Sequence, residues 1–139
     1  MDFARGLGLY VVLMLSSTLV QLMLWSGLAG SIEAARQFTP TGTVPALLVV
    51  AVTVINPVFE EFLWLGYGVN ALERFGLGGA CVISVALRTL VHAYQGAMAV
   101  VGILPLGIVM TLYYAGTRRL WPVIVAHAIL DAIALARLA

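Results

Sequence analysis

Apolar residues of this chain fall into five long runs, which short polar linkers separate. The runs cover Gly6–Ala29, Val44–Ala71, Leu77–Ala97, Val100–Gly116 and Leu120–Leu138. A helix that spans a bilayer needs about 20 mainly apolar residues, and each run is close to that length. The pattern therefore predicts an all-α fold, a polytopic transmembrane helical bundle with about five spans. We expect residues 1–139 to form a single membrane-embedded domain.

The composition supports a membrane protein and excludes several other classes. Hydrophobic residues make up 63% of the chain and charged residues 9%, against about 45–50% and about 25% in soluble domains. There is no lysine and the net charge is +1, so a basic surface for nucleic acid is not expected. The single cysteine excludes an internal disulfide or a thiolate metal cluster.

The arginines of the linkers predict how the spans are oriented. The first run is longer than the apolar part of a secretory signal, about 7–15 residues, so we expect a retained span. One side of a five-span bundle collects Arg5, Arg74, Arg118 and Arg119, and the other collects Arg36 and Arg137. Positive residues favour the cytoplasmic side. This predicts a cytoplasmic N-terminus, in a plasma membrane or bacterial inner membrane.

Ionisable residues inside the apolar runs are the most informative feature. A charged side chain at mid-membrane costs at least about 2.5–3.5 kcal/mol, so such groups usually face the bundle interior and pair with one another. We therefore expect these residues to share one polar site: Glu60, Glu61, Arg88, His92, His127 and Asp131.

Their spacing predicts which of these side chains share a helix face. Arg88 and His92 are four residues apart, as are His127 and Asp131, so each pair lies on one face. An aspartate one turn beyond a histidine can orient the imidazole or join it as a metal ligand.

The two adjacent glutamates, Glu60 and Glu61, cannot point the same way. Consecutive residues of a helix point about 100° apart. One should enter the site, and the other should meet a neighbouring helix or Arg88, which we expect to neutralise it. Pro57 cannot donate a backbone hydrogen bond, so we expect a looser or kinked helix just before the glutamates.

A carboxylate with two histidines is suited to hydrolysis. These groups can bind a divalent metal, with Zn²⁺ the expected ion, and lower the pKa of its water. They can also activate water directly, with a glutamate as general base. The sequence has no HExxH helix motif and no GxSxG motif, so a zincin-like site and a serine nucleophile of that kind are excluded.

The order of the motifs resembles the CPBP family, also called Abi, of intramembrane proteases. This family includes type II CAAX prenyl endopeptidases and bacteriocin-processing or self-immunity proteins. Its signature is EExxxR, then FxxxH, then HxxxN or HxxxD, on successive membrane helices. The matching stretches are "EEFLWLG" from Glu60, "RTLVHAYQG" from Arg88, and "HAILD" from His127. The CPBP-like core covers about 44–139, and the first span, 6–29, has no counterpart in the signature.

The resemblance implies a role for each matching residue. Glu60 would activate the attacking water or bind a metal, with His92 as its partner. His127 and Asp131 would complete the site, as metal ligands or as stabilisers of the oxyanion, and Glu61 would support them. The implied metal ligands are thus Glu60, His92, His127 and Asp131. The implied partners are membrane lipid and a peptide or lipidated-peptide substrate, without nucleic acid, and the sequence does not define an oligomeric state.

Three positions depart from the family signature. Leu65 stands where the first motif has arginine, and Arg88 stands where the second motif has phenylalanine. We expect Arg88 to supply the missing charge from another helix. Asp131 stands where prenyl endopeptidases tend to have asparagine, and an ionised aspartate cannot donate to an oxyanion.

These departures leave two other functions open beside proteolysis. Leu65 and the short chain favour a catalytically silent immunity or scaffold protein of the same fold. Intramembrane Glu, His and Asp residues also serve as proton or cation pathways. The sequence also leaves a conflict, because His92 and His127 are expected near opposite membrane faces. They can meet only if spans are tilted, broken or wrongly assigned. A helix that continues through "YQGAMA", a stretch that could also be re-entrant or broken, would place His92 deeper.

Overall fold

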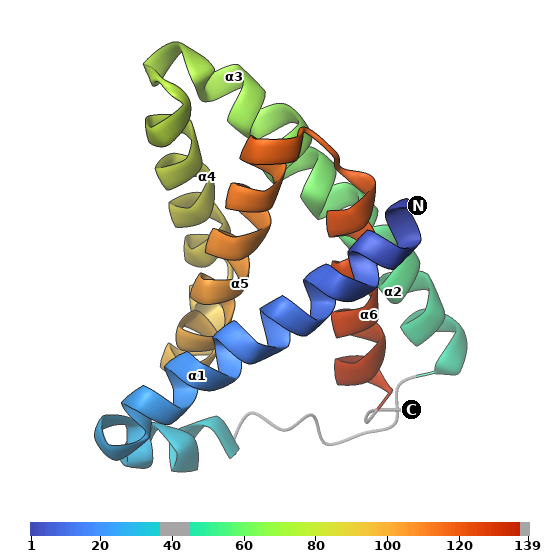
Figure 1. Ribbon diagram of the computed structural model, residues 1–139. Coiled ribbons are helices and arrows are strands. Elements are labelled where there is room, and N and C mark those ends of the chain that lie inside the picture. Colours follow the sequence, from blue (N-terminus) through green and yellow to red (C-terminus); the bar gives the residue numbers. More distant parts are fainter. Residues whose placement is uncertain (37–44, 137–139) are drawn as a thin grey trace.

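Apolar helices make up almost all of the computed structural model, which describes residues 1–36 and 45–136 (Figure 1). The elements are α1 (Asp2–Arg36), α2 (Ala46–Glu61), a π-helix (Phe62–Val69), α3 (Asn70–Leu72), a 3₁₀-helix (Glu73–Phe75), α4 (Leu77–Val91), a second 3₁₀-helix (Ala93–Gln95), α5 (Ala97–Thr117) and α6 (Trp121–Leu135). The prediction of an all-α helical bundle is confirmed. Among the positions named for the spans and linkers, Val44, Arg137 and Leu138 lie outside the described residues.

Each of the five apolar runs corresponds to a helical segment, although the segments differ in length. Within the described residues, Asp2–Leu24, Ala46–Phe75 and Ala99–Thr117 are long and apolar enough to cross a membrane. The helices α4 and α6 are apolar but shorter, with 15 residues each.

The third run was predicted to be helical to Ala97, and that prediction is wrong because the α-helix ends earlier. Helix α4 ends at Val91, and a 3₁₀ turn follows it. Gly96 then adopts a φ of 93°, a left-handed conformation that glycine tolerates and other residues rarely adopt. This break, which the sequence left open as a possibility, reverses the chain and places His92 at the end of its helix.

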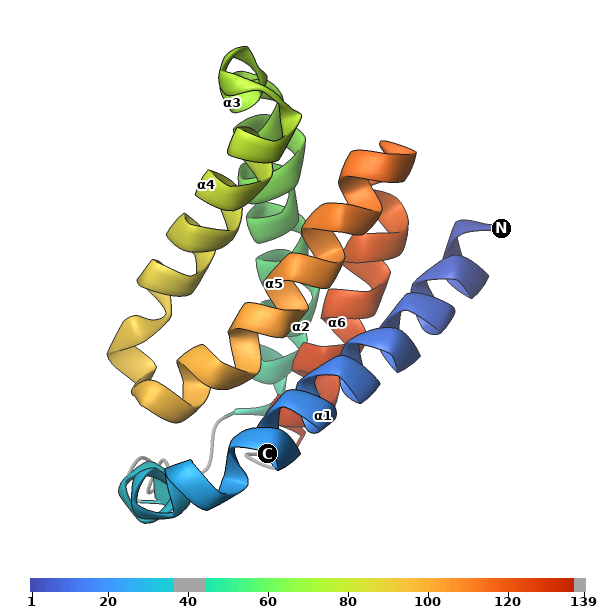
Figure 2. The ribbon, with the colours of Figure 1, turned by 60° about the vertical axis from the view of Figure 1, so that its left-hand side comes forward.

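The helices pack as a bundle that α1 crosses obliquely. Helix α4 returns alongside the π-helix and packs against α5, while α2 packs against α6. Helix α1 lies across both α5 and α6 (Figures 1 and 2). The first span, which has no counterpart in the family signature, therefore covers α6, the helix that carries His127 and Asp131.

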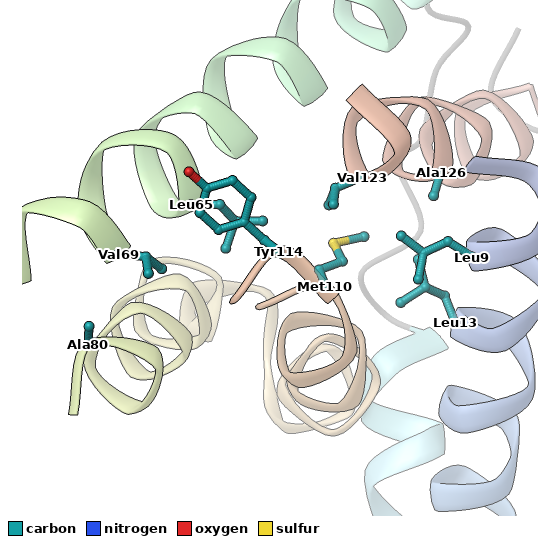
Figure 3. Close-up of a cluster of buried hydrophobic side chains, with 9 residues drawn as sticks. All are labelled: Leu9, Leu13, Leu65, Val69, Ala80, Met110, Tyr114, Val123 and Ala126. Atoms are coloured by element: carbon teal, nitrogen blue, oxygen red, sulfur yellow. The ribbon is translucent and has the colours of Figure 1, made fainter. Parts of the chain in front are cut away.

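The buried apolar core is formed by side chains of α1, α4, α5, α6 and the π-helix. It contains Leu9, Leu13, Leu65, Val69, Ala80, Met110, Tyr114, Val123 and Ala126 (Figure 3). Leu65 is fully buried, at 0% exposure. The residue that replaces the signature arginine is thus a core side chain, beside Tyr114 in Figure 3.

Charged side chains gather at the end of the bundle that holds the N-terminus. Asp2 pairs with Arg5 at 3.2 Å and with Arg119 at 3.0 Å. Arg118 pairs with Glu73, and this hydrogen bond raises the pKa of the Arg118 guanidinium. Arginines that were predicted to share one side of the membrane therefore do lie near one another.

Gly6 allows α1 to approach α6 closely, which predicts a specific sensitivity. A Cβ added at Gly6 would lie 2.6 Å from Cγ1 of Val125, whereas one at Gly8 meets nothing within 4 Å. We expect Gly6→Ala to lower the free energy of unfolding by about 1–3 kcal/mol through overpacking. Gly8→Ala is the matched control and should be neutral or stabilising by up to about 1 kcal/mol, because alanine favours helix. Equal melting temperatures for the two variants in detergent micelles would contradict this packing.

Candidate active site

The backbone that carries the two glutamates changes its winding directly after them. Helix α2 continues through Pro57, and the irregular segment is the π-helix that begins at Phe62. The expected irregularity thus follows the glutamates instead of preceding them. Some backbone carbonyls of the π-helix accept hydrogen bonds from side chains. Ser84 Oγ, for example, donates to the backbone oxygen of Trp64 at 2.8 Å. Winding of this kind is frequent at functional sites.

Glu61 forms a buried ion pair with Arg88. Nη1 of Arg88 donates to Oε1 of Glu61 at 2.7 Å, and Nη2 donates to Oε2 at 2.6 Å. The exposed fractions of the two side chains are 4% for Arg88 and 0% for Glu61. Gly107 leaves room for the stem of Arg88, because a Cβ there would lie 3.3 Å from Arg88 Cδ. Arg88 therefore supplies, from α4, the positive partner that the sequence lacks at Leu65.

Glu61 also holds the ring of His127. The Nδ1 atom of His127 lies 2.6 Å from Oε1 of Glu61. Because Glu61 receives two hydrogen bonds from Arg88 as a carboxylate, it is the acceptor, and Nδ1 of His127 is the donor. The other ring nitrogen, Nε2, is thereby directed away from Glu61. This contact links α2 to α6 through Glu61.

Glu60 points away from Glu61 and lies near His92. The Nε2 atom of His92 is 3.9 Å from Oε1 of Glu60. The other nitrogen, Nδ1, is 2.8 Å from the backbone oxygen of Arg88, which can only accept, so Nδ1 carries the proton. That bond fixes the ring orientation and leaves Nε2 facing the carboxylate. The separation is longer than a direct hydrogen bond and of the kind that a water molecule bridges.

His127 and Asp131 form a second pair on α6, as their spacing predicted. Nε2 of His127 is 3.5 Å from Oδ1 of Asp131. The other carboxylate oxygen, Oδ2, accepts a hydrogen bond of 3.4 Å from Nδ2 of Asn56, which lies on α2. Asp131 is thus held between its own helix and the helix that carries Glu60.

The two pairs line one cavity of about 780 Å³. Its lining includes Glu60, Arg88, His92, His127, Asp131 and Asn56, together with Tyr10 and Met14 of α1. His92 and His127, which the sequence placed at different membrane depths, therefore both line this cavity, His92 from the end of α4 and His127 from α6. Polar groups from three helices meet around a common space.

The carboxylates and imidazoles of this cavity are groups that bind divalent metals, and both histidines have the tautomer that a metal ligand needs. Both histidines have Nδ1 occupied by an oxygen acceptor and Nε2 turned toward a carboxylate, as metal-binding histidines typically do. Within the described ranges, however, no three His, Cys, Asp or Glu side chains come close enough to share an ion. The four candidate ligands stand as two pairs, Glu60 with His92 and His127 with Asp131.

Sequence reasoning missed the contributions of Asn56 and of α1. Asn56 is a polar residue one turn before Glu60 in an apolar run, and this spacing could have assigned it to the same face. Tyr10 and Met14 carry no comparable signal, because an apolar first span gives no indication of which face meets a cavity.

Comparison with known families identifies the chain. A family model described as "Type II CAAX prenyl endopeptidase Rce1-like" matches residues 42–133. The match includes all three motifs and the whole of α2. No curated protein and no solved structure matches the chain. With most of its length matched, and with the motif residues of three helices around one intramembrane cavity, the chain belongs to the Rce1-like family of type II CAAX prenyl endopeptidases.

Proposed function

We propose that this protein is an intramembrane endopeptidase that hydrolyses a peptide bond in the cavity lined by Glu60, His92, His127 and Asp131. The observation that carries the proposal is the pairing of Glu60 with His92 across 3.9 Å, inside a cavity that also presents His127. Membership of a CAAX-type protease family makes a peptide substrate in a membrane setting the expected class. A lipidated peptide, or a small bacteriocin-like peptide, is the proposed substrate, and a plasma membrane is the proposed location.

In the proposed reaction, Glu60 and His92 bind and activate water. A water molecule between the two side chains would lose its proton to the Glu60 carboxylate as its oxygen attacks the scissile carbonyl carbon. A C–O bond forms, and the carbonyl oxygen becomes an oxyanion. The C–N bond then breaks, and the proton on Glu60 passes to the leaving amine. His92, held by the backbone oxygen of Arg88, orients Glu60 and the water.

His127 would stabilise the oxyanion of the tetrahedral intermediate. Glu61 holds one ring nitrogen of His127 at 2.6 Å, so the other nitrogen has a defined direction in the cavity. When Nε2 carries a proton, it can donate a hydrogen bond to a developing negative charge. Asp131, 3.5 Å from Nε2, would orient the ring.

A divalent metal is the alternative way to activate the water. For this, the pairs Glu60–His92 and His127–Asp131 would have to move together around one ion, with Zn²⁺ as the expected metal, and the ion would lower the pKa of its water. The arrangement of the donors as two pairs favours direct activation by Glu60. Cleavage that survives a chelator would assign direct activation, whereas loss on chelation and return with zinc would assign the metal.

Leu65 in place of the signature arginine is not an argument for a catalytically silent protein, because Glu61 has another positive partner. Arg88 neutralises Glu61 from α4, so the charge that the first motif lacks is present at the site. A proton or cation pathway would need polar groups strung across the membrane, whereas these groups line one cavity. Proteolysis is therefore the function that we propose.

Replacing the proposed base tests the function directly. We expect Glu60→Gln to lower the rate of peptide cleavage at least about 100-fold, because a general base contributes about 10²–10⁴-fold and an amide cannot accept the proton. The assay is cleavage of a pool of membrane-associated peptides by the purified protein in liposomes, followed by mass spectrometry. Glu73→Gln is the matched control. Glu73 pairs with Arg118 at the end of the bundle away from the cavity, so the variant should cleave the peptides at the wild-type rate. Equal cleavage by wild type and Glu60→Gln would refute the proposal.

A further inference from the structure

Asn56 is a polar side chain that neither the sequence motifs nor the proposed reaction uses. It lies on α2 one turn before Glu60, within an apolar helix, and lines the cavity. An amide in such surroundings is costly unless it is hydrogen-bonded. Its nitrogen donates to Oδ2 of Asp131 at 3.4 Å. The amide thus links the helix of Glu60 to the helix that carries His127.

The contact divides the two oxygens of Asp131 between two partners. Oδ2 faces Asn56, while Oδ1 faces Nε2 of His127 at 3.5 Å. The ring of His127 is in turn held by Glu61, which Arg88 holds in place. These side chains form a continuous network with the amide at one end and the guanidinium at the other. Without the amide, the carboxylate could rotate and leave the ring.

We propose that Asn56 is a positioning residue of the site, whose amide holds the carboxylate of Asp131 against His127. An ionised Asp131 has no donor of its own, so the amide that holds it comes from α2. The catalytic meaning of this inference rests on the proposed function. The orientation of His127 that it predicts can be measured without turnover.

The chain has two histidines, which makes the orientation of each ring accessible by NMR. Protein labelled with ¹⁵N-histidine, in detergent micelles, gives ring signals from His92 and His127 alone, and His92→Gln assigns them. We expect Asn56→Ala to shift the ring-nitrogen signals of His127 and to leave those of His92 in place. Unchanged His127 signals in a folded Asn56→Ala protein would overturn the proposal.

Two further variants separate this role from a general loss of stability. Asn70→Ala is the matched control. Asn70 lies on α3, away from the cavity, and its amide donates to Oη of Tyr114 on α5. This variant should leave the signals of both histidines unchanged. Asn56→Asp keeps the side-chain size but replaces the donor with a second carboxylate, and we expect a larger His127 shift. It therefore tests the contact even if Asn56→Ala does not fold.

Kinetics then tests whether the positioning matters for cleavage. We expect Asn56→Ala to lower kcat about tenfold with little change in KM, a loss typical of residues that orient a catalytic group. In an Asp131→Ala background, Asn56→Ala should have no further effect, because its partner is gone. An equal further loss there would show that Asn56 does not act through Asp131. If wild type cleaves no peptide, the proposed function fails, but the NMR result still decides the contact.

Discussion

Replacing Arg88 with methionine is expected to lower the free energy of unfolding by about 3–5 kcal/mol. Removing one partner of a buried ion pair leaves the other charge without compensation, and losses of about this size follow. The pair between Arg88 and Glu61 meets the conditions for such a loss. Both side chains are almost fully buried, and two short hydrogen bonds join them.

The measurement is reversible unfolding in mixed micelles, with one matched control and one double variant. Arg74→Met removes an exposed arginine that lies over the ring of Phe75, so its effect should stay within about 0.5 kcal/mol. Adding Glu61→Gln to Arg88→Met removes the unpaired charge and should recover part of the loss. If Arg88→Met and Arg74→Met unfold alike, the buried pair is not important for stability.

The divergence of Glu60 and Glu61 could be predicted from helix geometry alone. Adjacent residues point about 100° apart, and only one could enter the site. The structure adds which one does: Glu60 lines the cavity, while Glu61 is buried with Arg88. That choice depends on where α4 lies relative to α2, which local periodicity does not contain.

The contacts that escaped prediction all join residues distant in the sequence. The bond from His127 to Glu61 spans 66 residues, and the bond from Asn56 to Asp131 spans 75. Spacing of three or four residues defines a helix face, but it does not say which faces meet. The end of α4 was also missed, because the apolar run continues to Ala97 whereas the α-helix ends at Val91.

The first helix shows the same limit. Its apolar length predicted a membrane span, and Asp2–Leu24 is long and apolar enough for one. It packs across α5 and α6 and places Tyr10 and Met14 in the cavity lining. This packing depends on how the side chains of the three helices fit together, which the apolar pattern does not contain. The sequence likewise does not distinguish Gly6 from the other glycines, and its close approach to Val125 is seen only in the structure.

Restoring the signature arginine is expected to harm this protein instead of improving it. We expect Leu65→Arg to lower the free energy of unfolding by about 3–5 kcal/mol, the loss typical of an uncompensated buried charge. Leu65 has 0% exposure and lies in the apolar core. Arg88 already occupies both oxygens of Glu61, so a second arginine would find no free partner there.

Exchanging both positions tests whether an arginine on the helix of Glu61 can replace the arginine on α4. In the variant Leu65→Arg with Arg88→Phe, the arginine stands four residues after Glu61, where helix geometry brings the two side chains together. The phenylalanine then fills the position that the second motif assigns to it. We expect the double variant to be more stable than either single variant, by a coupling of about 0.5–3 kcal/mol. Strictly additive losses in the same unfolding assay would mean that the arginine of α4 cannot be replaced by one on the helix of Glu61.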